Sequence, residues 1–374
     1  MRILFTGGFT LGSVTPLLAV AEELRELRIK NQELRIELIW VGTRNGPERK
    51  LVSDAGIKFS WILAPKWRRY FDARNLMVPL WFGCSVFWSA ILLLMRRPEV
   101  IVTAGGFVGV PIVWAAWLLR IPCLLHNQDV RFSLANKLVA PCVTRITYAL
   151  PGTVPRWWRK KTVWTGNPVR EFLFKGDRER GLRVCGFNNS HPAILVIGGG
   201  TGAKRLNEIA AEALPELTKK YQVIHLTGKG KKLETRNLKL ETKNKFPVSS
   251  FQFPNYCPFE FVTHEIADLY AASDLVITRA GMSVLSELAA LGKPMIIVPI
   301  PESHQEDNAR YFEKKRAAIV LDQRELTSAA LAGIVEKLMG ELGTIQEMSE
   351  RAREIMRPDA AKSVAGEIKG LAKN

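Results

Sequence analysis

The sequence predicts an α/β protein with two doubly wound, Rossmann-like domains that face a cleft. Its 374 residues exceed what one hydrophobic core usually serves, so two domains are the default expectation. Strand and helix signals alternate along the chain in two successive sets, which is the pattern of such domains. We expect an N-terminal domain at 1–165, a C-terminal domain at 166–350, and a C-terminal helix at 351–374 that packs back toward the N-terminal domain.

Each predicted domain has five strand signals. Those of the first domain are Arg2–Thr6, Arg35–Val41, Val100–Thr103, Cys123–Leu125 and Arg145–Tyr148. Those of the second are Ala193–Ile197, Gln222–Leu226, Leu275–Ile277, Met295–Val298 and Ala318–Leu321. Helices are expected from Pro16, over Leu76–Met95, after Gly202 and after Gly281. Residues 163–170 are expected to join the domains, and the charged stretch from about Glu325 is helical in pattern.

Composition indicates a globular chain with anionic partners. Apolar residues make up 47% and charged residues 24%, which excludes a largely disordered protein. Lys and Arg outnumber Asp and Glu by 53 to 36, and this surplus favours a polyanion, an anionic membrane face or phosphorylated ligands. The five cysteines show no CxxC spacing, so we expect a reducing cytoplasm and neither a zinc site nor a disulfide framework. The first apolar run is too short for a signal peptide.

Three glycine-rich turns come directly after predicted strands and before helices. They are Gly7–Ser13 (GGFTLGS), Gly105-Gly106-Phe107 and Gly198–Ala203. Glycines at such turns let backbone N–H groups approach a phosphate or sugar closely, although one such turn alone serves equally well for strand-to-helix packing. None of them fits the P-loop pattern, and the first does not supply G-x-G-x-x-G, so nicotinamide chemistry is disfavoured.

One β-α-β segment, Leu275–Asn308, has the layout of a sugar-nucleotide site. The helix after the Ala280-Gly281 turn offers free N–H groups to a diphosphate, and Glu287 on it would face a ribose diol. The loop His304–Asn308 would lie beside the same helix at the carboxyl edge of the sheet. The alternative is an ordinary β-α-β packing unit without a ligand.

The segment Leu76–Met95 carries no charge over twenty residues, which is the length of a membrane-spanning helix. We expect an interfacial helix, because Pro79 and Gly83 should break it early and both flanks are basic. A buried core helix and a true span remain alternatives. The expected membrane contacts are Trp81, Phe82, Phe87, Trp88, Arg68, Arg69 and Arg74, and the Trp-rich stretch Pro155–Lys161 would add to them or be a solvated loop.

Seven sequence blocks resemble a known family in their order and spacing. They are Gly7–Ala21, Gly105–Phe107, His126–Asp129, Gly166–Arg170, Gly202–Asn207, Arg279–Ala290 and His304–Ala309. Together they make the chain similar, over nearly its whole length, to the MurG family of peptidoglycan N-acetylglucosaminyltransferases.

This resemblance implies a GT-B fold and an inverting transferase. Such an enzyme moves N-acetylglucosamine (GlcNAc) from UDP-GlcNAc to undecaprenyl-diphosphate-linked N-acetylmuramyl-pentapeptide, converting lipid I to lipid II. The resemblance also implies a peripheral position on the anionic cytoplasmic face of the cell membrane. It implies no required cofactor or metal and no nucleic acid partner; the sequence has no Asp-x-Asp near the donor blocks.

The resemblance assigns the donor to the C-terminal domain. Met282 and Ser283 would give N–H groups to the diphosphate, and Glu287 would bind the ribose. Val262 would offer its backbone to the uracil. The remaining donor residues would be Arg170, Gly199, Gly200, Thr201, His304, Gln305 and Asn308, of which the last three would reach the sugar. For Arg170 a surface ion pair is the alternative reading.

The acceptor side departs from the family pattern. The acceptor and diphosphate loops would consist of Gly7, Gly8, Phe9, Thr10, Gly12, Ser13, Gly105, Gly106, Phe107 and Asn127. Ser13 stands where the family has His in GGTGGH, and Asn127 and Asp129 stand where the family's H-E-Q-N has Glu and Asn.

These departures leave the catalytic base open. Because an amide cannot take a proton from the attacking hydroxyl, Asp129 or His126 would be the base, with Asp129 preferred. A loop-binding carboxylate and a buried structural histidine are their respective alternatives. A related GT-B transferase with another lipid or sugar acceptor, or a catalytically impaired UDP-sugar-binding membrane protein, also fits the sequence.

Overall fold

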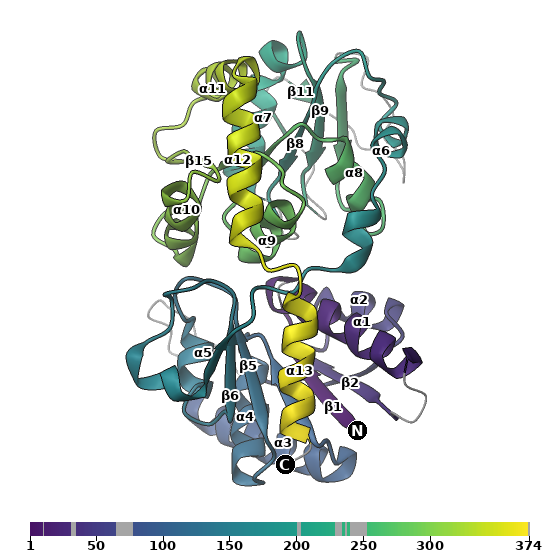
Figure 1. Cartoon of the computed structure of the whole chain (residues 1–374), viewed down its shortest axis with the longest axis vertical. Coiled ribbons are helices and arrows are strands. Elements are labelled where there is room, and N and C mark those ends of the chain that lie inside the picture. The colour runs from purple at the N-terminus through teal and green to yellow at the C-terminus, as the bar shows by residue number, and fades with distance from the viewer. Residues whose placement is uncertain are drawn as a thin grey trace. The chain divides into compact units, whose positions relative to one another are not determined.

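The computed structural model of the chain describes residues 1–9, 11–30, 35–64, 78–199, 203–228, 234–235, 238–239 and 253–372. They form two compact units, Met1–Arg170 with the segment from Arg357 onward (unit 1) and Glu171–Met356 (unit 2) (Figure 1). The chain divides between the units after Arg170 and after Met356, whereas the sequence placed these boundaries after residues 165 and 350. Each unit contains a parallel sheet with helices on it, which confirms the predicted fold class.

Unit 1 is built on a seven-stranded sheet in the order β3-β2-β1-β4-β5-β6-β7, in which all pairs are parallel. Its strands are β1 (Arg2–Thr6), β2 (Glu37–Gly42), β3 (Lys58–Trp61), β4 (Val100–Thr103), β5 (Cys123–Asn127), β6 (Arg145–Tyr148) and β7 (Thr162–Trp164). Its helices are α1 (Thr15–Lys30), α2 (Glu48–Asp54), α3 (Val78–Arg96), α4 (Gly109–Leu118), α5 (Leu134–Val139) and α13 (Ala360–Ala372), with 3-10 turns at Leu11–Ser13 and Arg156–Lys161.

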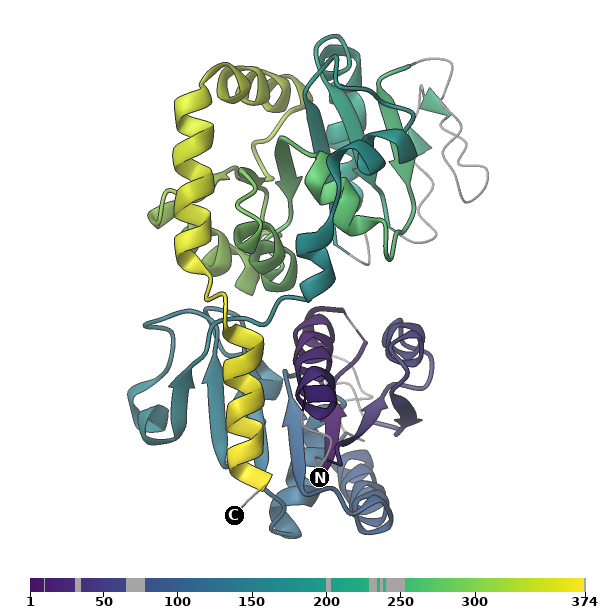
Figure 2. The ribbon, with the colours of Figure 1, turned by 45° about the vertical axis from the view of Figure 1, so that its right-hand side comes forward.

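The strand residues of unit 1 bury side chains on both faces of the sheet, as parallel sheets require. Along β1, Phe5 packs with α1 and the C-terminal helix α13 on one face. These two helices lie side by side (Figure 2). The next residue back, Leu4, packs with α3 and α4 on the other face. The sheet is therefore covered by helices on both sides, and the C-terminal helix belongs to the core of unit 1.

Unit 2 has a six-stranded parallel sheet in the order β12-β9-β8-β13-β14-β15 and a two-stranded antiparallel ribbon. Its strands are β8 (Ala193–Ile197), β9 (Gln222–Leu226), β10 (Glu234–Thr235), β11 (Leu238–Lys239), β12 (Tyr256–Phe259), β13 (Leu275–Thr278), β14 (Met295–Ile297) and β15 (Ile319–Val320). Its helices are α6 (Arg178–Val184), α7 (Lys204–Leu217), α8 (Ile266–Ala272), α9 (Met282–Ala290), α10 (His304–Lys314), α11 (Ser328–Gly340) and α12 (Leu342–Ile355), with a 3-10 turn at Glu171–Lys175.

One predicted feature of α3 is wrong. The helix runs without interruption from Val78 to Arg96, whereas we expected Pro79 and Gly83 to break it. Pro79 is the second helical residue, where the missing N–H has no intrahelical partner to lose and the fixed φ suits the first turn. Gly83 is tolerated inside the helix at a cost of about 1 kcal/mol relative to alanine.

Each unit contains one fully buried histidine whose two ring nitrogens are hydrogen-bonded. In unit 1, His126 on β5 contacts Thr147 Oγ1 at 2.9 Å and Asn167 Oδ1 at 2.8 Å. In unit 2, His225 on β9 contacts Tyr256 Oη and Asn207 Oδ1, both at 3.2 Å. Burial lowers the pKa of His126 to about 4 and that of His225 to about 3.

These two histidines should make both units less stable as the pH falls. The unfolded chain takes up protons near pH 6.5 whereas the folded chain does not, so stability is full above pH 6.5 and is lost below it. By pH 5 each histidine should cost about 2 kcal/mol of unfolding free energy. Urea unfolding between pH 7 and 5 measures this. Replacing the surface histidine His191 with asparagine should leave the trend intact, and a flat profile would contradict it.

Candidate active site

Each sheet has one point where the strand order reverses, and the sequence-predicted loops follow the strands there. In unit 1 this point lies between β1 and β4, followed by the loops Gly7–Ser13 and Gly105–Phe107. In unit 2 it lies between β8 and β13, followed by the segment before α7 and the Ala280-Gly281 turn before α9. Open α/β sheets bind ligands at the carboxyl ends of the strands at such points. Each unit therefore brings its candidate loops together at the expected place.

The first glycine loop is held by three side chains that the sequence did not single out. Trp40 Nε1 on β2 donates to Gly7 O at 3.0 Å, and Gln128 Nε2 donates to Gly12 O at 2.6 Å. The carboxylate of Glu48, at the start of α2, accepts from the backbone N–H of Phe9 at 3.1 Å. Thr10, which belongs to the same predicted loop, lies outside the described residues.

The second glycine turn approaches the first loop closely. Gly105 and Gly106 have φ angles of +97° and +88°, a region that only glycine adopts at little cost. A Cβ at Gly105 would lie 2.4 Å from Asn136 Oδ1, and one at Gly106 would lie 3.4 Å from Gly8 O. Ser13 is buried on the first loop, and its hydroxyl has no hydrogen-bond partner among the described residues.

Aromatic rings join the same two loops. Phe9 and Phe107 meet edge to face with ring centroids 5.5 Å apart, and the Phe9 ring is half exposed. Such an aromatic pair contributes roughly 0.5–1.5 kcal/mol beyond the area it buries. The two loops are thus coupled through this pair of side chains.

The residues at the end of β5 and in the turn after it differ in burial. Asn127 is fully buried; its amide donates to Asp129 O at 2.8 Å and accepts from Asn136 Nδ2 at 2.9 Å. It therefore fixes the turn that carries Asp129, whose side chain is half buried. Because His126 is fully buried and held by Thr147 and Asn167, its contacts favour the alternative role, a structural histidine. Of the two predicted bases, only Asp129 is accessible.

In unit 2 the N-terminus of α9 is open. Gly281 precedes the helix, no side chain caps it, and a Cβ at Gly281 would meet nothing within 4 Å. The backbone N–H groups of Met282 and Ser283 begin this helix and have no intrahelical partner. A helix N-terminus of this kind favours an anion, and phosphate in particular, through the N–H groups of its first turn and the helix dipole.

Two polar side chains lie next to this helix N-terminus. Glu287, on the second turn of α9, is 6% exposed and accepts from Tyr270 Oη on α8 at 3.1 Å. Asn308 on α10 is fully buried and donates to Ala280 O at 3.1 Å. Tyr270 thus orients Glu287, the residue predicted to bind the ribose. Asn308 supports the turn that precedes α9.

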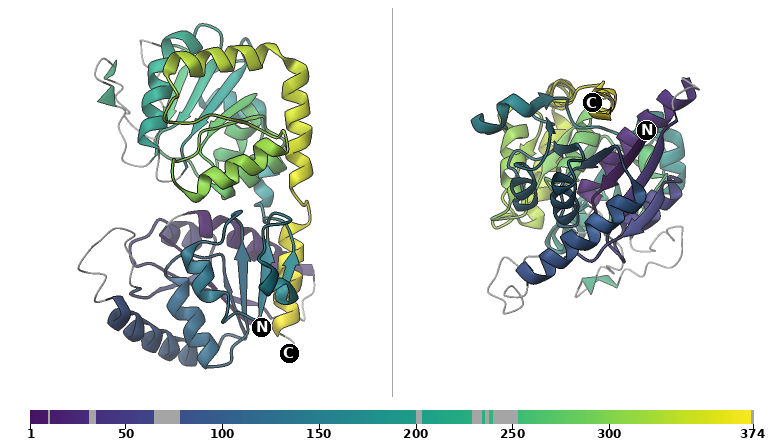
Figure 3. Two further views of the ribbon diagram at one scale, coloured as in Figure 1. Left: turned by 90° about the vertical axis from the view of Figure 1, so that its left-hand side faces the viewer. Right: turned by 90° about the horizontal axis from the view of Figure 1, so that it is seen from below.

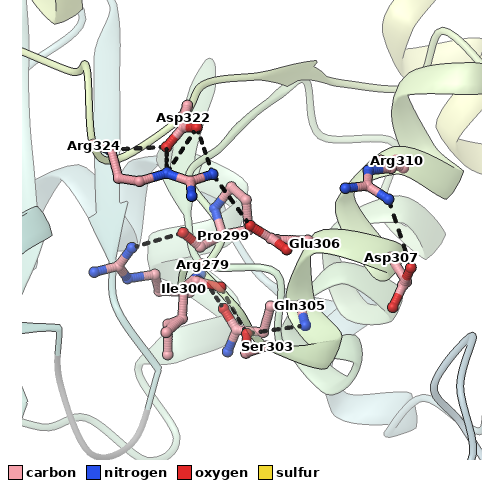
Figure 4. A network of polar contacts seen from close by, with 10 residues as sticks. All are labelled: Arg279, Pro299, Ile300, Ser303, Gln305, Glu306, Asp307, Arg310, Asp322 and Arg324. Atoms are coloured by element: carbon pink, nitrogen blue, oxygen red, sulfur yellow. Dashed lines mark hydrogen bonds and ion pairs between the residues drawn. The ribbon is translucent and has the colours of Figure 1, made fainter.

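A polar network fixes the loop between β14 and α10 (Figure 4). The buried guanidinium of Arg279 donates to Val298 O at 3.0 Å and Pro299 O at 3.3 Å, and burial lowers its pKa. Gln305, which is predicted to bind the sugar, is hydrogen-bonded to the loop, because its Oε1 accepts from Ile300 N at 3.1 Å. Ser303 caps α10 by accepting from Gln305 N. Further out, Arg324 pairs with Asp322 at 2.8 Å and with Glu306 at 3.6 Å.

The other predicted donor residues are more scattered. His304 is exposed at the first position of α10, and Val262 is half exposed three residues beyond β12. Gly199 has a φ of +85°, and a Cβ there would meet none of the described residues within 4 Å; Gly200 and Thr201 lie outside the described residues. Arg170 is the last residue of the first segment of unit 1. In the described part of the chain, no three His, Cys, Asp or Glu residues are grouped as metal ligands would be.

Helix α3 lies at the periphery of unit 1 (Figure 3), and its exposed side is rich in large apolar side chains. Its buried residues are Ser85, Ser89 and Leu93, and the two serine hydroxyls donate to backbone oxygens. Its exposed residues include Trp81 at 55%, and Phe87 and Trp88 at 64% each. A buried core helix, one of the alternatives for this segment, would not expose these aromatic side chains. An exposed apolar surface of this kind is typical of a site for an apolar partner.

Four predicted membrane residues of this region differ from the exposed aromatic residues of α3. Phe82 is half buried and packs edge to face on Trp114 of α4, with centroids 5.9 Å apart. Arg68, Arg69 and Arg74 lie outside the described residues. Among the described helices, α3 alone is both long enough and apolar enough to cross a membrane. Length and composition by themselves are weak evidence for a membrane span.

Comparisons with known proteins agree with one another. The glycosyltransferase family 28 N-terminal domain matches residues 3–148 and the family 28 C-terminal domain matches residues 193–364. A UDP-N-acetylglucosamine--N-acetylmuramyl-(pentapeptide) pyrophosphoryl-undecaprenol N-acetylglucosamine transferase of Bacillus cereus is 37% identical over 90% of this chain and 91% of that protein. One of Legionella pneumophila is 37% identical over 90% and 88%. The crystal structure of Acinetobacter baumannii MurG has a TM-score of 0.72 and 25% identity, covering 99% of each chain.

Proposed function

Because the chain belongs to glycosyltransferase family 28, and within it to the MurG transferases, we propose that it transfers GlcNAc from UDP-GlcNAc to polyprenyl-diphosphate-linked N-acetylmuramyl-pentapeptide. The product is the lipid-linked disaccharide of peptidoglycan synthesis. The observation that carries this proposal is the open N-terminus of α9 with Glu287 one turn further along. It places anion-binding N–H groups and a carboxylate that can bind a ribose diol on the same helix, as a nucleoside diphosphate site requires.

On the donor side, the residues divide into those that bind and those that position. We assign the diphosphate to the N–H groups of Met282 and Ser283, and the ribose to Glu287. As UDP leaves, negative charge grows on the diphosphate, so donors fixed at a helix N-terminus stabilise the transition state more than the ground state. Gln305 and His304 are assigned to the sugar, and Arg170 and Val262 to the diphosphate and the uracil. Asn308 acts through the Ala280 backbone.

On the acceptor side, the two coupled glycine loops of unit 1 are assigned to the acceptor's diphosphate. Asp129 is the proposed base that takes the proton from the attacking hydroxyl. Its backbone is held by Asn127, which the family pattern would replace with Glu. The carboxylate has moved two residues along the same turn, so a base is retained although Asn127 itself cannot serve as one.

The exposed side of α3 is the proposed docking surface for the anionic cytoplasmic membrane face. Replacing Trp81, Phe87 and Trp88 together with serine should weaken binding to anionic vesicles at least a hundredfold, since each exposed aromatic ring buries into lipid with roughly 1–3 kcal/mol. Vesicle co-sedimentation measures this. A control that replaces the exposed Phe174 and Leu342 of unit 2 should bind as the parent does. Unchanged binding of the triple variant would rule out this surface.

A transferase with a different lipid-linked acceptor is the alternative, and Ser13 favours it. Its buried hydroxyl, which has no partner among the described residues, stands where the MurG family pattern has a histidine. A panel of acceptors separates the two. Lipid I and a polyprenyl-diphosphate-GlcNAc are each incubated with labelled UDP-GlcNAc in detergent. Product from lipid I alone supports the main proposal, and product from the second acceptor alone supports the alternative. Donor binding without product from either would point to a catalytically impaired protein.

A further inference from the structure

Glu48 is a buried carboxylate that binds the first glycine loop. It is fully buried at the first position of α2. Its Oε1 accepts from Thr43 N at 2.7 Å and from Thr43 Oγ1 at 2.5 Å, and its Oε2 accepts from Phe9 N at 3.1 Å. All three donors are neutral N–H or O–H groups. Burying a carboxylate is costly unless its oxygens are hydrogen-bonded, so these three bonds are what keep it in place.

Three glycines make the room that this carboxylate occupies. A Cβ would lie 2.2 Å from Glu48 Oε1 at Gly8, 2.9 Å from the same oxygen at Gly42, and 1.9 Å from Oε2 at Gly46. Any side chain at these positions would collide with the carboxylate. The glycine of the first loop, Gly8, therefore serves the approach of Glu48 as well as the turn itself.

The residue that Glu48 holds is strained. Phe9 has a φ of +71°, a left-handed conformation that is unfavourable for a residue with a side chain. Such strain persists only where neighbouring groups enforce it. Here the Glu48 carboxylate binds the Phe9 N–H, and the Phe9 ring packs on Phe107 of the second glycine turn. One carboxylate on α2 thus sets the backbone of one loop and, through a ring, reaches the other.

We propose that Glu48 is a positioning residue for the lipid-linked acceptor: it locks the first glycine loop in the conformation that binds the acceptor's diphosphate. This rests on the function proposed above for the two loops. Glu48 does not touch the substrate, because it is buried beneath the loop and its oxygens are occupied. The N–H of Phe9 is consumed by this bond, so the diphosphate binds other groups of the loop.

The Glu48→Gln variant tests this. Phe9 N and Thr43 N bind different oxygens of the carboxylate, and glutamine has only one oxygen, so its NH2 group must face one of these donors. We expect the KM for a lipid I analogue to rise at least tenfold, while the affinity for UDP-GlcNAc stays within twofold. The matched control is Asp54→Asn at the exposed other end of α2, which should change neither value.

A second readout does not depend on the function. Amide hydrogen exchange in residues 5–13 should be at least tenfold faster in Glu48→Gln than in the parent, with exchange in unit 2 unchanged. If the parent transfers no GlcNAc, the proposed function fails, and this exchange result still decides whether Glu48 locks the loop. Parent-like acceptor KM, or an equal loss of donor affinity, in the variant would overturn the proposal.

A milder change covers the case in which Glu48→Gln does not fold. Thr43→Val removes one donor to the carboxylate, the hydroxyl, and keeps the backbone N–H. It should raise the acceptor KM about threefold with no change in donor affinity. A parent-like acceptor KM in a folded Thr43→Val protein, with parent-like exchange in residues 5–13, would overturn the proposal.

Discussion

Replacing Asp129 with asparagine should slow GlcNAc transfer by about 10²- to 10⁴-fold, the contribution of a positioned general base. The substitution keeps the size of the side chain and removes its ability to take a proton from the attacking hydroxyl. UDP-GlcNAc should bind as tightly as to the parent, because the proposed donor residues Met282, Ser283 and Glu287 belong to unit 2. Single-turnover transfer and calorimetric UDP binding on one preparation measure both quantities.

Two further variants make this result specific. Asp54→Asn changes an exposed carboxylate of unit 1 and should leave the rate unchanged. His126→Gln should lower the stability of unit 1, because it disturbs two buried hydrogen bonds, while the folded fraction keeps its turnover number. Full activity of the Asp129 variant would remove this residue from the mechanism, and loss of turnover in the folded His126 variant would restore histidine as the base.

The second large effect is expected at Glu287. Replacing it with glutamine should weaken UDP-GlcNAc binding by roughly 10- to 150-fold, since a hydrogen bond from a hydroxyl to a charged group is worth about 1.5–3 kcal/mol. Glutamine can still accept from Tyr270 Oη, so the side chain keeps its orientation and loses its charge. Isothermal titration with UDP-GlcNAc and with UDP lacking the ribose 2′-hydroxyl measures the effect.

The comparison ligand provides the internal check. If Glu287 binds the ribose diol, the parent should discriminate against the 2′-deoxy ligand and the variant should not. Tyr270→Phe keeps the carboxylate but removes the group that orients it, so its affinity should fall only a few-fold. Parent-like discrimination in the Glu287 variant would place the ribose elsewhere.

The sequence predicted the fold well where strands are apolar and bounded by glycine turns. The buried strands β1, β4, β8 and β13 begin at the predicted residues, because a parallel sheet with both faces covered produces continuous apolar runs. It missed β3, β7 and β12, which lie at sheet edges. β12 contains Pro258, which reads against a strand in sequence yet is tolerated at an edge, where one side of the ladder needs no partner.

The candidate site was predictable only in part, for a physical reason. Glycine turns and helix starts are local, so the loops at both strand-order reversals were found from the chain itself. The groups that hold them are distant in sequence: Trp40 and Glu48 bind a loop more than thirty residues earlier, and Gln128 binds Gly12 from 116 residues away. A buried Glu at the start of a short helix looks in sequence like an ordinary helix-dipole partner.

Sequence also could not decide between the roles of neighbouring residues on one turn. His126, Asn127 and Asp129 are all polar, and the sequence shows no difference in their burial. In the structure the first two are fully buried and hydrogen-bonded inward, whereas Asp129 is half buried. Likewise, α3 reads as uniformly apolar, and only its packing reveals that the serines face inward and the aromatic rings outward.

The measurement that tests the central claim most directly is transfer from labelled UDP-GlcNAc to a lipid I analogue in detergent, with the configuration of the new glycosidic bond determined by NMR. A disaccharide product linked through a β bond, formed with inversion of the α-linked donor, is the predicted result. Donor hydrolysis without transfer, or a product with retained configuration, would contradict the account of an inverting, base-assisted transferase.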